Sequence, residues 1–130
     1  MLVKTIEYTD YDGETRKETF YFNLTEAERV EMELSKEGGY KAMLQRIIDA
    51  KDVPKLTAAF KDLILKSYGI KSDDGRRFIK SKEISEEFSQ TPAYSKLFIE
   101  LLSDTDAAAA FANGIVGAVS DKPEISSVNA

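Results

Sequence analysis

Two short acidic turns are the segments whose residue types best suit metal binding. One spans Asp10–Gly13 and the other Asp73–Gly75, and each ends in glycine. A calcium loop of the EF-hand kind has glycine at its sixth position, an oxygen ligand at its first and a glutamate at its twelfth. Aligned on that glycine, the first turn places Tyr8 and Thr19 at the two ligand positions, and the second places Ile70 at the first. The sequence therefore predicts ordinary turns and no metal site.

Serine and threonine hydroxyls are plentiful, but the chain lacks the groups that would activate one as a nucleophile. It contains no histidine and no cysteine, so the usual general base and all thiol chemistry are missing. Acidic pairs such as Glu86–Glu87 and Asp104/Asp106 lie beside expected helix starts or on exposed faces. The helix dipole and solubility explain them more simply than acid–base chemistry does. No glycine-rich loop suited to phosphate binding links a strand to a helix. We therefore expect no enzymatic activity, no catalytic residue and no cofactor.

The composition is typical of one globular domain with an acidic surface. The chain has 130 residues, of which 42% are hydrophobic and 32% charged, and its formal net charge is −5. Nucleic-acid binding favours a basic face, so no nucleic-acid partner is expected, and the basic stretch Lys71–Lys82 is interpreted as a solvated turn. No apolar stretch approaches the roughly 20 residues that span a bilayer, and the first residues lack the pattern of a secretory signal. We expect a cytoplasmic protein with no membrane partner.

Apolar and polar residues alternate one by one in the first part of the chain, and this pattern predicts a β-hairpin. Ile6 and Tyr8 alternate with polar residues, and Phe20 and Phe22 do so again beyond the turn at 10–13. Alternation of this kind is typical of strands that are buried on one side. A hairpin alone is only marginally stable, so its apolar face must be covered by other elements.

Helical spacing of the apolar residues begins after the hairpin. Thr25 and Glu28 form a capping box for the first helix, in which Ala27, Val30 and Leu34 share one face. Further start and stop signals lie at Gly38–Gly39, Asp52, Gly69, Ser81, Thr91–Pro92, Ser103 or Asp104, and Asn113–Gly114. These residue types are those that favour helix caps and helix ends.

Together these signals predict an α+β fold, in which an N-terminal β-hairpin is followed by about five or six short amphipathic helices and the chain is mostly helical. One globular domain is expected over residues 1–117, with the hairpin in 2–24 and the helical part in 25–117. Residues 77–79 are expected to be briefly extended against the hairpin. Beyond Gly117 no periodicity remains, which predicts a flexible C-terminal tail over 118–130.

One apolar surface near the C-terminal end is a candidate for binding a partner. Its residues are Tyr94 and Phe98 on one expected helix, and Phe111 and Ile115 on the next. Apolar stripes of this kind pack into the core in most proteins, but a helix can also present one to the groove of a partner. The alanine run 107–110 would let a second helix approach closely. Self-association is also expected, since the hairpin has edges that can pair with another copy.

Several runs of residues are distinctive in their exact sequence and not only in their apolar spacing. They are Thr5–Gly13, Phe20–Thr25, Ile64–Gly69, Asp74–Ser81, Phe88–Ser95 and Phe111–Ile115. Together they resemble the tail assembly chaperones of long-tailed, siphovirus-type bacteriophages. The resemblance extends over about residues 2–117 and includes no catalytic signature.

That resemblance implies a specific role in virion morphogenesis. Such proteins bind the long tape measure protein, keep it soluble, and help tail tube subunits assemble around it. They act in the cytoplasm of the infected or lysogenic bacterial host and are generally absent from the mature virion. Many are made in two forms by ribosomal frameshifting, and this chain would correspond to the shorter form. The tape measure protein, and with it the tail tube protein, are therefore the expected partners.

Two other hypotheses remain open at this point. The chain is alternatively a small structural tail or connector component, which would persist in purified virions. A small nucleic-acid-binding regulator would instead use Arg76, Arg77, Lys80 and Lys82, and its binding would weaken steeply as salt rises.

Overall fold

The computed structural model describes residues 1–117, and the tail expected over 118–130 lies outside the described residues. The strands of the described part are β1 (Leu2–Thr9), β2 (Thr15–Phe22), β3 (Tyr68–Lys71) and β4 (Phe78–Ile79). They form one sheet in the order β1-β2-β3-β4, with every neighbouring pair antiparallel. The predicted N-terminal hairpin, β1 with β2, is confirmed.

The acidic turn of the hairpin uses its carboxylate to hold its own backbone. Asp10 accepts hydrogen bonds from the backbone N–H groups of Asp12 and Glu14, both at 2.9 Å. The Arg16 guanidinium pairs with the same carboxylate at 2.5 Å, and these contacts keep the pKa of Asp10 below its usual value, the Arg16 hydrogen bond having the largest effect. Gly13 takes a φ of 84°, a conformation that glycine adopts readily.

Strand β3 is a feature that the helical reading of the sequence missed. The sequence predicts a helix end at Gly69, but the helix ends at Ser67, and both Tyr68 and Gly69 belong to β3. Residues 78–79 are extended as expected, yet they pair with β3 and not with the hairpin itself. Gly69 is required here for space, because a Cβ at this position would lie 2.5 Å from a ring carbon of Phe78 and 2.8 Å from the carbonyl oxygen of Ile79.

Six helices occupy the rest of the described chain, namely α1 (Glu26–Leu34), α2 (Tyr40–Ala50), α3 (Val53–Ser67), α4 (Lys82–Ser89), α5 (Pro92–Ser103) and α6 (Thr105–Val116). The expected N-caps are confirmed, since the side chains that accept first-turn N–H groups are those of Thr25, Asp52, Ser81, Thr91 and Asp104. The chain is therefore α+β and mostly helical, as the sequence predicts. No helix within residues 1–117 has the length and apolar character needed to cross a membrane.

The end of α6 differs from the sequence-based expectation. A stop near Asn113–Gly114 was predicted, but the helix continues to Val116 and ends at Gly117, whose φ is 85°. Gly114 is explained by close packing instead, because a Cβ there would lie 2.9 Å from a methyl carbon of Leu2 on β1. The glycine thus lets a helix and a strand approach each other.

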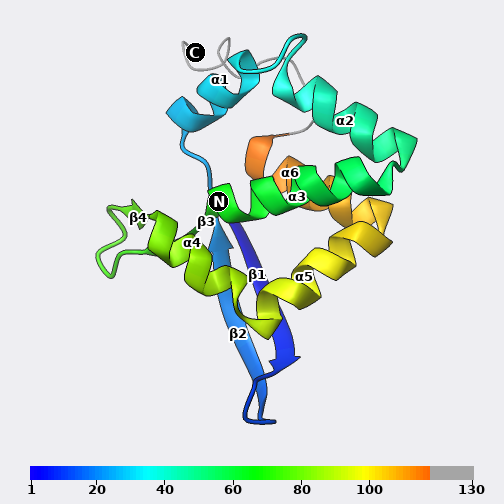
Figure 1. The fold of residues 1–130 in the computed structure, drawn as a ribbon. Coiled ribbons are helices and arrows are strands. Elements are labelled where there is room, and N and C mark those ends of the chain that lie inside the picture. The colour runs from blue at the N-terminus through cyan, green and yellow to red at the C-terminus, as the bar shows by residue number, and fades with distance from the viewer. Residues whose placement is uncertain (118–130) are drawn as a thin grey trace.

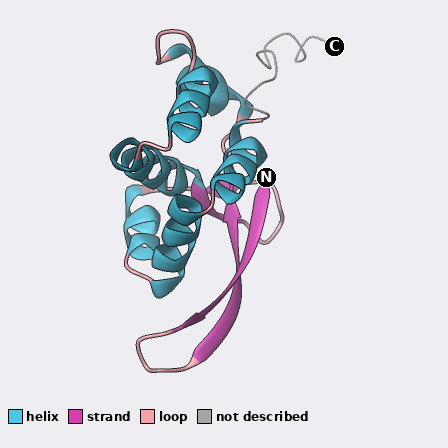
Figure 2. Cartoon of the chain, turned by 90° about the vertical axis from the view of Figure 1, so that its right-hand side faces the viewer, coloured by secondary structure: helices cyan, strands magenta, loops and turns pink. Residues whose placement is uncertain are grey.

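The helices lie on one side of the hairpin, whose distal end projects beyond them (Figures 1 and 2). Between sheet and helices lies a single cluster of buried apolar side chains. The most deeply buried large ones are Phe22, Leu44, Phe60, Leu63, Ile64, Leu97 and Leu101. On the opposite face of β1, residues such as Val3 and Thr5 remain exposed.

Helix α1 stands apart from this core. None of its residues is buried, and it packs only against α2 among the elements with more than marginal contact. The face shared by Ala27, Val30 and Leu34 points outward, and Leu34 is 73% exposed. We call these three residues the outer stripe of α1.

Candidate functional site

Helix α5 carries the aromatic half of the predicted partner-binding face. Its start is set by Thr91, whose hydroxyl accepts from the backbone N–H of Tyr94, and by Pro92 in the first turn. Tyr94 and Phe98 lie one helical turn apart, and their rings stack with centroids 5.7 Å apart and planes 15° apart. Both side chains are partly exposed. They therefore present a preformed aromatic surface at the edge of the core.

The stacked pair packs against a larger cluster of aromatic side chains that is centred on Phe88. Phe88 meets Tyr94 edge-on at 5.8 Å and stacks on Tyr68 at 4.0 Å. Phe88 also contacts Phe20 and Phe22 of the hairpin, at 5.3 and 5.8 Å. Aromatic contacts of this kind stabilise by about 0.5 to 1.5 kcal/mol each beyond simple burial. The hairpin and the α4–α5 region thus hold the exposed pair rigidly.

The other two predicted residues do not share that surface. Phe111 is 3% exposed and Ile115 is 4% exposed, so both belong to the core. Phe111 lies edge-on to Phe22 at 5.3 Å, and its ring is tilted by 55° to that of Phe60, with centroids 6.5 Å apart. Helical spacing tells which residues share a stripe, but not the direction that the stripe faces, and α6 turns its stripe toward α2, α5 and β1. A partner-binding role for Tyr94 and Phe98 stays a prediction, and the four residues form no common exposed face.

A groove between α2 and α3 is a surface that sequence reasoning missed. It consists of two hollows of about 470 and 450 Å³ that share Met43, Ile47 and Lys55 and so run together. Its apolar lining residues are Tyr40, Met43, Ile47, Ala50, Ala58 and Ala59. Its charged lining residues are Lys36, Arg46, Asp52, Lys55, Asp62 and Lys66. We call this surface the α2–α3 groove.

The sequence feature that could have indicated this groove is the wide arc of apolar residues around α2. Tyr40, Leu44 and Ile48 are buried, whereas Met43 and Ile47 are only partly so, so the helix has more apolar surface than its own core contacts cover. The Tyr40 hydroxyl is buried without a hydrogen-bond partner among the described residues. Its burial, with a smaller contribution from the charge of Asp62, raises the pKa of Tyr40 to about 12, so the phenol stays neutral.

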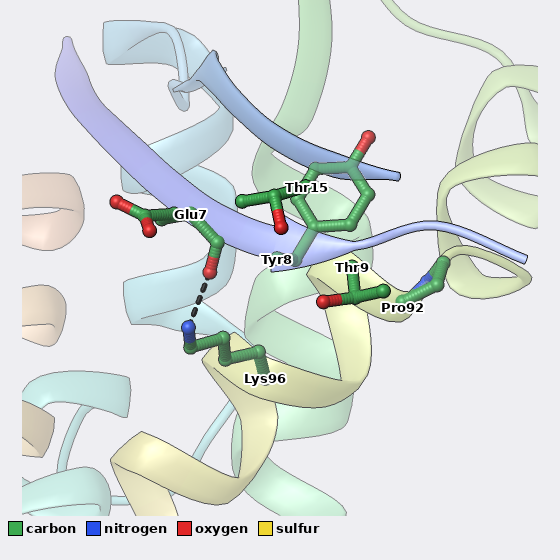
Figure 3. A pocket seen from close by; sticks show the side chains of 6 residues that line it. All are labelled: Glu7, Tyr8, Thr9, Thr15, Pro92 and Lys96. Carbon is green, nitrogen blue, oxygen red and sulfur yellow. Dashed lines mark hydrogen bonds between the residues drawn. The ribbon is translucent and has the colours of Figure 1, made fainter. Parts of the chain in front are cut away.

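A smaller hollow of about 350 Å³ lies where the hairpin meets the start of α5 (Figure 3). Lys96 reaches across from α5 and donates to the backbone carbonyl oxygen of Glu7 in β1. The remaining lining includes Tyr8, whose hydroxyl donates to the Glu18 carboxylate, and Pro92. The lysine therefore holds α5 against the strand.

Lys80, in the basic stretch interpreted as solvated, has a structural role instead. Its ammonium donates to both carboxylate oxygens of Glu28 at 2.7 Å and to the carbonyl oxygens of Asn23 and Lys66 at 3.1 and 3.3 Å. Burial tends to raise the pKa of Glu28, but the bonds from Lys80 and from the Thr25 backbone outweigh it and lower that pKa. One side chain thus ties the hairpin, α1 and α3 together. Arg76 and Arg77 remain exposed.

The described residues offer candidate binding surfaces, namely the stacked aromatic pair on α5 and the α2–α3 groove. Within residues 1–117, no group of three acidic, histidine or cysteine side chains is placed to hold a metal ion. A family model described as phage tail assembly chaperone matches residues 1–120. The chain belongs to that family. No curated protein and no solved structure matches it. The resemblance seen in the sequence is thereby confirmed, and a role in phage tail assembly favours binding over catalysis for this chaperone.

Proposed function

We propose that this chaperone binds the tape measure protein, keeps it soluble, and promotes assembly of the tail tube around it. The observation that carries the proposal is the stacked pair Tyr94 and Phe98, partly exposed on a rigid base. Aromatic residues held in place bind apolar partner surfaces at little cost in conformational entropy. A net charge of −5 would keep such a complex dispersed by repulsion between copies.

The proposal includes where the protein acts. The chaperone binds the tape measure protein in the cytoplasm of the infected or lysogenic bacterial host, before the tail is complete. It leaves before the virion matures. The tail tube protein is the second proposed partner, since it assembles around the same long protein.

Co-expression with the tape measure protein encoded by the same phage tests the proposal directly. We expect the tape measure protein to move from the insoluble to the soluble fraction and to co-purify with the chaperone. Phe98→Asp should reduce the captured amount at least about tenfold, because an anchor lost from an apolar interface costs more than roughly 1.4 kcal/mol. Thermal melting must show that the variant is folded.

Ile99→Asp is the matched control, because Ile99 is 62% exposed and, as the next residue on α5, is turned about 100° around the helix from Phe98. It adds the same charge to the same helix and should leave capture unchanged. Equal loss in both variants would refute the proposed surface. A tape measure protein that stays insoluble and unbound would refute the function, and abundant peptides of this chain in purified virions would favour a structural tail component instead.

A further inference from the structure

The α2–α3 groove follows the length of two neighbouring helices. Only residues 51 and 52 separate α2 from α3, so the chain turns back at once and α3 runs alongside α2 in broadly the opposite direction (Figure 1). The lining residues are Tyr40, Met43, Ile47 and Ala50 on α2, and Lys55, Ala58, Ala59, Asp62 and Lys66 on α3. Intervals of three and four residues mark one face of a helix. Each helix therefore presents one continuous stripe to the groove.

The apolar part of this lining is open to solvent. Met43 and Ile47 line both hollows and are partly exposed, and Ala50 and Ala58 are exposed. Methionine is unbranched and flexible, so it adapts to the shape of a partner. Alanine side chains let another helix approach closely, because the distance between packed helices depends on the side chains at the contact. The middle of the groove thus suits an apolar helix face.

Positive charge is left unpaired around this apolar part. The two carboxylates of the lining are already engaged, since Asp62 pairs with Lys66 at 3.1 Å and Asp52 accepts from the backbone N–H of Lys55 at 3.3 Å. The cationic side chains of Lys36, Arg46 and Lys55 are exposed and form no ion pair within residues 1–117. This basic surface is a local exception in a protein whose net charge is −5.

We propose that the α2–α3 groove binds an acidic amphipathic helix of a different protein. The apolar face of that helix lies on Met43 and Ile47, and its flanking carboxylates pair with Lys36, Arg46 and Lys55. From Tyr40 to Ala50 the α2 stripe spans about 15 Å, or about three helical turns. Apolar anchors at positions i, i+4 and i+7 of the partner all fit within that length. The stacked pair on α5 takes no part, so the proposal goes beyond tape measure binding and does not depend on it.

Charge determines which helix binds, and the apolar contacts provide most of the affinity. Exposed ion pairs each add little to binding, but unfavourable charges exclude a partner of the wrong sign and favourable ones speed the encounter. One helix in one groove buries less surface than a standard protein interface. We therefore expect an affinity that is moderate, selective for acidic helices and weakened by salt.

Two synthetic peptides that differ only in charge test this selectivity with the full chain. Each is a capped, alanine-based helix of about four turns with leucine at positions i, i+4, i+7 and i+11. The acidic peptide has glutamate beside the leucines, and its basic twin has lysine at the same positions. By fluorescence anisotropy, the wild-type protein should bind the acidic peptide at least about tenfold more tightly than the basic twin. Added salt should reduce that difference.

Reversing one charge in the groove should shift the selectivity. Lys55 lines both hollows, and glutamate suits its position in the first turn of α3, behind the N-cap Asp52. Lys55→Glu should therefore fold normally, weaken binding of the acidic peptide about three- to tenfold, and strengthen binding of the basic twin. Lys61→Glu is the matched control, because Lys61 is exposed on α3 outside the lining, and it should leave both affinities unchanged.

An obstruction inside the groove tests the apolar contact. Ala58→Glu adds bulk and negative charge at an exposed lining position, and it should weaken binding of the acidic peptide at least about tenfold. Ala110→Glu makes the same change at an exposed position on α6 and should have no effect. Thermal melting must show that each variant is folded.

Four results would overturn the proposal. Wild-type protein that fails to bind the acidic peptide would refute it, and equal binding of the two twins would show a nonspecific apolar contact. Unchanged affinity in Ala58→Glu would place the peptide elsewhere on the protein. Affinity that falls as the protein concentration rises would assign the groove to a second copy of this chain. Peptide binding is measured without the tape measure protein, so its outcome is separate from that of the capture experiment.

Discussion

Lys80 joins segments that are distant in the sequence, because its ammonium donates to Asn23, Glu28 and Lys66 at once. Its side chain is 19% exposed, whereas that of Glu28 is 38% exposed, so water partly screens the ion pair. Hydrogen bonds from a charged group to several acceptors usually stabilise more than an exposed ion pair does. At the residue scale, Lys80 is therefore one of the contacts that attach α1 to the rest of the fold.

Replacing Lys80 with methionine should lower the free energy of unfolding by about 1 to 2 kcal/mol at neutral pH, after allowance for screening at Glu28. The pKa of Glu28 is lowered in the folded state from a reference value of 4.5, so its contribution is complete above that pH. It is lost as the pH falls below 4.5 through the folded-state pKa. Denaturant unfolding as a function of pH should show the difference between wild type and Lys80→Met narrowing in that acidic range.

Lys82→Met is the control for this prediction, because Lys82 is 90% exposed and lies 3.9 Å from Glu86. It should change stability by less than about 0.5 kcal/mol. An equal loss in both variants would show that general charge, and not the contacts of Lys80, is responsible.

Helix α1 has a local sequence signal as strong as any in the chain, yet it lacks buried residues. Its capping box is complete, since Glu28 N–H donates to the Thr25 hydroxyl and Thr25 N–H donates to the Glu28 carboxylate. Short helices in water are marginal without tertiary packing. At the element scale, α1 is thus held by its cap, by Lys80 and by one face of contacts.

Thr25→Ala should weaken α1 by about 1 kcal/mol without unfolding the core. Hydrogen exchange is the appropriate measurement, with faster exchange expected in residues 26–34 and little change in α3, which carries five buried residues. Thr91→Ala, which removes the cap of α5, is the comparison and should affect a helix that belongs to the core. Faster exchange throughout the protein after Thr25→Ala would contradict a local role for α1.

Local signals predicted the helix starts well because a cap involves residues only three or four positions apart. Thr25, Asp52, Ser81 and Thr91 each begin a helix where the sequence indicates. Non-local features were missed for the opposite reason. The pairing of β3 with β2 joins Tyr68 to Phe22, and no pattern within either segment encodes that partnership.

By itself, then, the sequence determined the α+β class, the hairpin, the helix caps and the family. Only the tertiary structure decided which apolar stripes face the core. It buried Phe111 and Ile115, left Tyr94 and Phe98 partly exposed, and turned Leu34 outward. Periodicity fixes the face on which residues lie, but the direction of that face depends on contacts with elements far away in the chain.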